Sequence, residues 1–271
     1  MDREVDEHWL KHSDIHLVTL QECGVKMFGN RRERRGGLGL LLLLERLMSV
    51  GSVGPITLLT IAGQSLLYMG IINPPWHSYD VCLSGEAILR YKNYRRLLLS
   101  AIEHSDDIHL YHNMVSFLFK GRTLERLFGS VKFFILLVVF TLATSLTYVG
   151  LAWAATEYFK SYSYMRECAV GFSGVIFALK VLTTHYERSH YSQVMWFTVP
   201  SKYAVWAELL IIHILVPRAS FIGHLAGILV GVAYVYGPLS GVVNAIHTTV
   251  AGPPRPSYTY AYGTTRGYTY R

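Results

Sequence analysis

Apolar residues along the chain gather into blocks that alternate with shorter polar stretches. A bilayer core about 30 Å thick is crossed by about 20 helical residues, so two of the six blocks are long enough to cross alone. The other four are shorter or carry polar residues, which suits helices shielded from lipid inside a bundle. The pattern predicts an all-α membrane protein with six transmembrane helices. The blocks are Pro55 to Ile72, Ile108 to Phe119, Phe133 to Ala155, Cys168 to Leu182, Tyr203 to Val216 and Ala219 to Tyr236.

The two ends of the chain differ from this central part. Leu38 to Val50 begins with leucines but meets Glu45 and Arg46 within two turns, which favours a helix in the membrane interface over a seventh span. The last 21 residues are rich in Pro, Gly, Thr and Tyr without helical or strand periodicity. We therefore expect three regions: an N-terminal extension with an interfacial helix (1–53), a six-span domain (54–239) and a disordered tail (240–271).

Composition and charge support the membrane interpretation. Hydrophobic residues make up 51% of the chain and charged residues only 16%, against about 25% charged residues in soluble domains. The net charge of +7 is scattered near the ends of predicted spans, which argues against a nucleic-acid partner. Enrichment of Lys and Arg on the cytosolic side predicts cytosolic termini and a non-cytosolic loop at 73–107.

The chain contains three cysteines, Cys23, Cys82 and Cys168. Their spacing forms neither a metal site nor a disulfide framework, and we expect no metal or cofactor. Cys82 and Cys168 share the predicted non-cytosolic side, so the sequence leaves a disulfide between them as an open alternative. Unpaired cysteines that pack in the core are the favoured expectation.

Four polar residues are predicted at one depth in the bundle. Ser173 lies five residues into the fourth predicted span and His224 five residues into the sixth, while His109 and Asn113 lie one turn apart near the start of the second. These three spans run in the same direction, from the non-cytosolic face inwards. The four side chains are therefore expected at the same shallow level.

The four residue types suit acyl transfer. A histidine can accept the proton of a serine hydroxyl and make it nucleophilic. An asparagine amide, an imidazole N–H and the serine backbone N–H can stabilise the resulting oxyanion. An ionised carboxylate at this depth would be costly, so the sequence favours a Ser-His dyad over a triad. Phe177, one turn after Ser173, is placed to hold the imidazole ring.

Small residues can bring the helices of Ser173 and His224 together. Gly171 and Gly174 flank Ser173, and Gly174 and Ala178 lie four residues apart, as do Gly223, Gly227 and Gly231. Small residues at this spacing let membrane helices approach closely. Serine, histidine and GxxxG steps are nevertheless common in spans that catalyse nothing. From the residues alone, an intramembrane hydrolase and a transporter or scaffold remain equally open.

The motifs together resemble the rhomboid family of intramembrane serine proteases. The resemblance is carried by "GFSGVIFAL" around Ser173, "GHLAGILVG" around His224, "HLYHN" at His109 and Asn113, and "LERLFGS" after the second span. It implies a six-helix rhomboid fold with Ser173 as nucleophile and His224 as general base. It also implies that His109, Asn113 and the backbone N–H of Ser173 form the oxyanion site.

The resemblance also suggests a cellular setting. It points to members found in the endoplasmic reticulum, which cleave single-span or polytopic membrane proteins and pass unstable clients to degradation. It implies an integral, multi-pass protein of that membrane, with membrane-protein substrates, the lipid bilayer, and ubiquitinated clients and degradation machinery as partners. A non-catalytic, client-binding relative is the alternative, and retention of both Ser173 and His224 argues against it.

Overall fold

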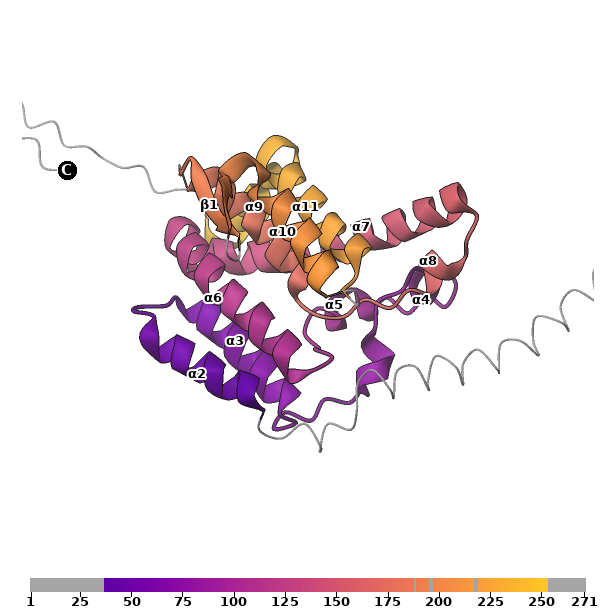
Figure 1. Ribbon diagram of the computed structural model, residues 1–271, viewed down its shortest axis with the longest axis horizontal. Coiled ribbons are helices and arrows are strands. Elements are labelled where there is room, and N and C mark those ends of the chain that lie inside the picture. The colour runs from indigo at the N-terminus through magenta and orange to yellow at the C-terminus, as the bar shows by residue number, and fades with distance from the viewer. Residues whose placement is uncertain (1–36, 188, 195–196, 217–218, 253–271) are drawn as a thin grey trace, which may run out of the picture.

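The structure is a computed structural model that describes residues 37–187, 189–194, 197–216 and 219–252. It is a bundle of helices with one two-stranded β-sheet (Figure 1). The longer helices are α2 (Leu38–Ser49), α3 (Pro55–Tyr68), α6 (Asp107–Phe128), α7 (Ser130–Phe159), α9 (Ser173–Tyr186), α10 (Ser201–Leu215), α11 (Phe221–Tyr236) and α12 (Leu239–Ala251). The short elements are η2 (Ser78–Val81), α4 (Gly85–Leu89), α5 (Arg96–Leu99), α8 (Ser163–Arg166), β1 (Tyr191–Val194) and β2 (Phe197–Pro200).

A helix occupies each of the six apolar blocks. By length and apolar content, α7 is the one helix among the described residues that is long enough to cross a membrane, and α11 with α12, bent by 73°, is either a broken span or a re-entrant loop. The helix α3 is apolar but shorter. The prediction of six helices in these positions is therefore confirmed, whereas the count of six membrane spans stays a prediction.

The core of the bundle lies where α9 packs against α6, α7 and α11. Its largest buried side chains include Phe117 of α6, Phe133 and Phe140 of α7, and Leu179 of α9. The outer faces of the helices are apolar as well. Trp153 of α7 and Ile214 of α10 are 55% and 75% exposed. Large apolar side chains exposed on the outside of a bundle suit helices that face lipid.

Local sequence signals set where the key helices begin. The Asp106 side chain accepts the backbone N–H of His109 and caps α6, and Ser220 caps α11 through the N–H of Gly223. Gly129 separates α6 from α7 with a φ of +79°, a left-handed conformation that favours glycine. The caps formed by Asp106 and Ser220 therefore fix where the helices that carry His109 and His224 begin.

Glu125, near the end of α6, fastens the beginnings of two neighbouring helices. Its buried carboxylate accepts the backbone N–H groups of Ile56 and Thr57 at 2.9 Å each, and the hydroxyls of Thr57 and Ser130 at 2.7 and 2.8 Å. A carboxylate at a helix N-terminus is stabilised by the unpaired N–H groups there. Glu125 therefore fixes how α3 and α7 meet α6.

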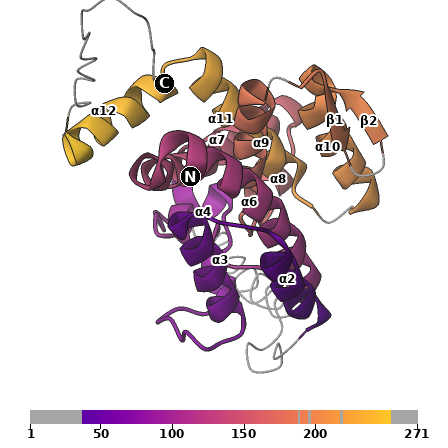
Figure 2. The same cartoon turned by 90° about the vertical axis from the view of Figure 1, so that its left-hand side faces the viewer.

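The helix α2 packs lengthwise on α6. The backbone N–H of Gly39, near its start, donates to Asp107 at 2.7 Å, and Gly51, just beyond its end, lies beside Arg122. Figure 2 shows α2 alongside α3 and α6. Leu43 is buried in the core, whereas four other large apolar side chains of the helix are exposed: Leu38, Leu41, Leu44 and Met48. The placement of this helix in the membrane interface stays a prediction.

Two further elements differ from the sequence expectations. β1 and β2 pair antiparallel, so the fold is not purely α-helical. Residues 239–251 form α12, so the expectation of disorder from residue 240 is wrong for this segment; Val243 anchors it by packing into the core. The remainder of that predicted tail lies outside the described residues.

Cys82 and Cys168 form a disulfide, with Cα atoms 5.6 Å apart. The expectation of unpaired cysteines is therefore wrong. The physical reason is a backbone pairing next to the bond: Leu83 and Ala169 exchange two hydrogen bonds of 2.9 Å, which places the two cysteines side by side. The segment between α3 and α6 is thereby joined to the residues that precede α9.

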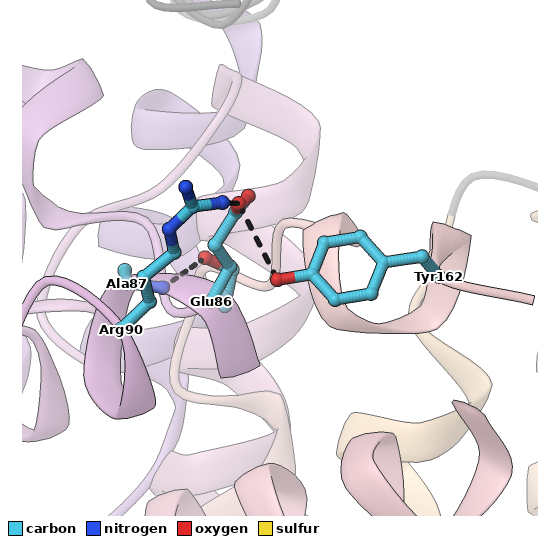
Figure 3. Close-up of polar contacts among 5 residues, drawn as sticks. Glu86, Ala87, Arg90 and Tyr162 are labelled. Atoms are coloured by element: carbon cyan, nitrogen blue, oxygen red, sulfur yellow. Dashed lines mark hydrogen bonds and ion pairs between the residues drawn. The ribbon is translucent and has the colours of Figure 1, made fainter. Parts of the chain in front are cut away.

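The same segment is also tied to the connection after α7. The Glu86 carboxylate of α4 accepts hydrogen bonds from Arg90 and from the Tyr162 hydroxyl, each at 3.4 Å (Figure 3). Burial and the neighbouring Glu86 carboxylate raise the pKa of Tyr162. The tyrosine therefore stays protonated, and able to donate this bond, across the physiological range.

Candidate active site

Ser173 and His224 meet at the same end of the bundle. Ser173 is the first residue of α9 and His224 the fourth residue of α11. The His224 Nε2 atom lies 3.0 Å from the Ser173 Oγ atom, within hydrogen-bonding distance. This pairing has the geometry of a nucleophile and its general base.

The imidazole of His224 is held by packing. It is buried, with 6% of the residue exposed, and stacks on the ring of Phe177 with centroids 4.6 Å apart and planes at 30°. Phe177 lies one turn after Ser173 on α9. The helix that carries the hydroxyl therefore also carries the surface that orients the imidazole.

His109 and Asn113 lie beside the turn that precedes Ser173. Gly171 in this turn has a φ of +111°. A Cβ atom built on Gly171 would lie 2.7 Å from the ring of His109 and 3.2 Å from Asn113 Nδ2. Only glycine therefore satisfies both the backbone conformation and the available space. The structure brings His109 and Asn113 to the Ser173 turn, as their shared depth in the sequence predicts.

The Asn113 amide nitrogen has no hydrogen-bond partner within the described part of the chain, although the side chain is 6% exposed. A buried donor without an acceptor costs free energy and calls for an explanation. The first turn of α9 adds its own unpaired N–H groups and the positive end of its dipole at the same place. These donors can converge on a negatively charged oxygen that forms next to Ser173.

The orientation of His109 depends on Ser105. His109 Nδ1 lies 2.9 Å from the Ser105 hydroxyl, which lies 2.8 Å from the Asp106 carboxylate. The hydroxyl donates its one hydrogen to Asp106 and so accepts from His109 Nδ1–H; only a hydroxyl turned to donate to Nδ1 leaves the proton of the neutral imidazole on Nε2. The Nε2 edge faces Gly171. The buried ring of His104 contacts the His109 ring edge to face, with centroids 5.2 Å apart.

The helices α9 and α11 approach backbone to backbone. A Cβ atom on Gly227 would overlap the carbonyl oxygen of Gly174, and one on Gly231 would lie 2.8 Å from the carbonyl oxygen of Ala178. A Cβ atom on Gly174 would lie 2.8 Å from the side chain of Thr144 of α7 and 3.1 Å from the carbonyl oxygen of Gly223. This close approach sets the distance between Ser173 and His224.

Gly223 differs from the other predicted small residues. A Cβ atom at this position would meet its nearest neighbours, two atoms of Ser220, at 3.4 Å, which is an ordinary contact distance. Gly223 contributes to the packing through its carbonyl oxygen, which lies against Gly174. The requirement for a missing side chain therefore falls on Gly227 rather than on Gly223.

Three features of the site could not be read from the motifs. The Ser100 carbonyl accepts the N–H of Gly171 at 2.8 Å, Ser105 contacts His109, and the Cys82–Cys168 disulfide lies five residues before Ser173. A serine in a polar loop has no sequence pattern that marks it, and the contact between Ser100 and Gly171 involves only main-chain atoms. In the described ranges no three His, Cys, Asp or Glu side chains are grouped to hold a metal ion.

The sequence is similar to known proteins. The Rhomboid domain model matches residues 91–240. The chain is 43% identical to mouse Rhomboid-related protein 4, over 82% of this chain and 71% of the relative, and 42% identical to the human protein of that name, over 84% and 73%. It is 38% identical to Rhomboid-like protein 14, mitochondrial, from Arabidopsis thaliana, over 77% and 64%. This chain therefore belongs to the rhomboid family and is an integral membrane protein.

Proposed function

We propose that this protein is an intramembrane serine endopeptidase that cleaves membrane-protein substrates with a Ser173–His224 dyad. The observation that carries the proposal is the 3.0 Å contact between Ser173 Oγ and His224 Nε2, made by two helices that glycines bring together. A serine hydroxyl is a weak nucleophile until a neighbouring base accepts its proton. The buried, stacked imidazole of His224 is such a base.

In the proposed reaction, neutral His224 accepts the Ser173 proton as Oγ attacks the scissile carbonyl carbon. The carbonyl oxygen becomes an oxyanion, which accepts hydrogen bonds from Asn113 Nδ2–H, from the N–H of Ser173 and, once the Ser105 hydroxyl turns from Asp106 to donate to Nδ1, from His109 Nε2–H. His224 then donates its proton to the leaving amine, which leaves an acyl-enzyme. Water, deprotonated by His224, hydrolyses that ester and regenerates Ser173.

The unpartnered Asn113 amide supports this assignment. Donors that already lie where charge develops need no rearrangement during the reaction, which is the source of their catalytic effect. A purely structural asparagine at 6% exposure would be expected to have found an acceptor in the bundle.

We further propose that the protein acts in the endoplasmic reticulum membrane, on clients bound for degradation and alongside ubiquitin-dependent machinery. The motif resemblance supports this setting. The Cys82–Cys168 disulfide supports it as well, because it joins segments at the dyad end of the bundle, and disulfides persist in oxidising compartments such as the lumen.

The nucleophile can be tested with a fluorophosphonate probe and a single-span membrane substrate in proteoliposomes. Wild-type protein should take up the probe and cleave the substrate, and Ser173→Ala should do neither while remaining folded in the membrane. Ser161→Ala, in the exposed turn after α7, is the matched control and should behave like wild type. Normal cleavage by Ser173→Ala would refute the assigned nucleophile. Absence of labelling in folded wild-type protein would favour a client-binding relative without catalysis.

A further inference from the structure

A basic cleft lies between α6 and α9, at the ends of these helices away from the dyad. It has a volume of about 450 Å³. Four cationic side chains line it, with one acidic residue: Lys120, Arg122 and Arg126 of α6, Lys180 of α9, and Glu187 just beyond α9. Its lining residue nearest to Ser173 along α9 is Lys180, seven residues further on, about 10 Å at 1.5 Å per residue. The cleft is therefore distinct from the site at Ser173.

The positive charge of the cleft is only partly neutralised. Lys180 pairs with Glu208 of α10 at 3.2 Å. Across the described residues, Lys120, Arg122 and Arg126 form no ion pair. Lys120 donates to the Ser116 hydroxyl instead, at 2.6 Å. The buried Arg122 Nε atom has no hydrogen-bond partner there either. A buried guanidinium N–H without a protein acceptor is costly and calls for an explanation.

The position of the cleft indicates which kind of anion it would meet. Arg126 lies two residues before the end of α6, and Glu187 directly follows α9. In an integral membrane protein such helix ends reach the level of the lipid headgroups. Phe119, which is 50% exposed, lines the same cleft and offers an apolar edge next to the cations. Basic pockets between membrane helices recognise anionic headgroups, and arginine pairs with phosphate through two N–H groups.

We propose that the basic cleft binds the phosphate group of an anionic lipid. Arg122 and Arg126 hold the phosphate oxygens, Lys120 supplies charge at the base, and an acyl chain runs along Phe119. The bound lipid bridges α6 and α9, so it stabilises the folded bundle. The proposal concerns a site apart from the dyad and stands whether or not Ser173 is catalytic.

The test uses the full-length protein in detergent with dioctanoyl phosphatidic acid as the probe. Native mass spectrometry gives the bound fraction, and thermal unfolding gives the stabilisation. Arg122→Gln/Arg126→Gln should weaken binding by at least about tenfold, since two charge-assisted interactions are lost. Lys132→Gln/Lys202→Gln removes the same charge outside the cleft, where both lysines lie over aromatic rings. This control should bind like wild type.

Three results would overturn the proposal. Equal weakening by both double variants would show diffuse surface attraction without a site. Equal stabilisation by dioctanoyl phosphatidylcholine would show that negative charge is irrelevant. Saturation by inorganic phosphate at the same concentration would show that no lipid is required. If the double variant does not fold, Arg126→Gln alone, at an exposed position, gives the same comparison with Lys132→Gln.

Discussion

Around Ser173, single residues act mainly through main-chain geometry. The left-handed conformation of Gly171 turns the chain into α9 and leaves space for His109 and Asn113. The Ser100 carbonyl fixes the same glycine from a distant part of the sequence. The turn that leaves space for His109 and Asn113 is therefore held by a contact between main-chain atoms.

Replacing Asn113 with Ala should separate catalysis from folding. Loss of one oxyanion donor lowers kcat by about 10²-fold with little change in KM. Because the amide has no partner, its removal should not lower the unfolding temperature. Steady-state cleavage kinetics and thermal unfolding measure the two effects. Asn244→Ala, on the outer face of α12, is the control. An unchanged kcat would argue that Asn113 plays no part in the reaction.

The residues that bear chemistry were open to prediction because their types and spacing are informative. Ser173, His224, His109 and Asn113 share one level, and the structure places them there. Ser105 was not predicted, because its contact with His109 depends on how the polar segment before α6 folds. A serine in such a segment has no periodicity that distinguishes it from its neighbours.

Among the elements, α9 and α11 depend on how closely they pack. Their approach rests on Gly227, whose missing side chain leaves space for the Gly174 carbonyl group. Moving the two helices apart would lengthen the contact between Ser173 and His224. The glycines of α11 thus help to set the distance between the side chains of Ser173 and His224.

The variants Gly227→Ala and Gly223→Ala should therefore differ, although they lie one turn apart on the same helix. The first forces a methyl group into a carbonyl oxygen and should cost about 1–3 kcal/mol of unfolding free energy, together with most probe labelling. The second meets only ordinary contacts and should be near neutral, because Ala favours a helix over Gly by up to about 1 kcal/mol. Denaturant unfolding and fluorophosphonate labelling give the comparison. Equal effects of the two variants would contradict it.

Long apolar blocks predicted the helices well, whereas the shorter elements escaped prediction. The strands β1 and β2 have four residues each and are mostly exposed, so no alternating pattern marks them. The sequence of α12 contains glycine and several β-branched residues, which have low helix propensity. Its contact with the core through Val243 is a tertiary effect that propensity does not reveal.

At the scale of the whole molecule, the segment between α3 and α6 is held against the residues that precede α9. It is joined there by the Leu83–Ala169 pairing, by the Cys82–Cys168 bond and by the Ser100 carbonyl. Arg96 of α5 donates to the Cys82 carbonyl oxygen at 2.7 Å and braces the same point. Segments far apart in sequence thus meet within a few residues of Ser173, which no local pattern could predict.

The disulfide makes the chain behave as a closed ring between positions separated by 86 residues. A recognition sequence for a site-specific protease, inserted after Lys160 in the exposed turn that ends α7, would open this ring without releasing either piece. On a denaturing gel the cut protein should run as one species until a thiol reductant divides it into two. The same cut in Cys82→Ser should give two bands at once, and one persistent band there would mean that some other covalent link joins the halves.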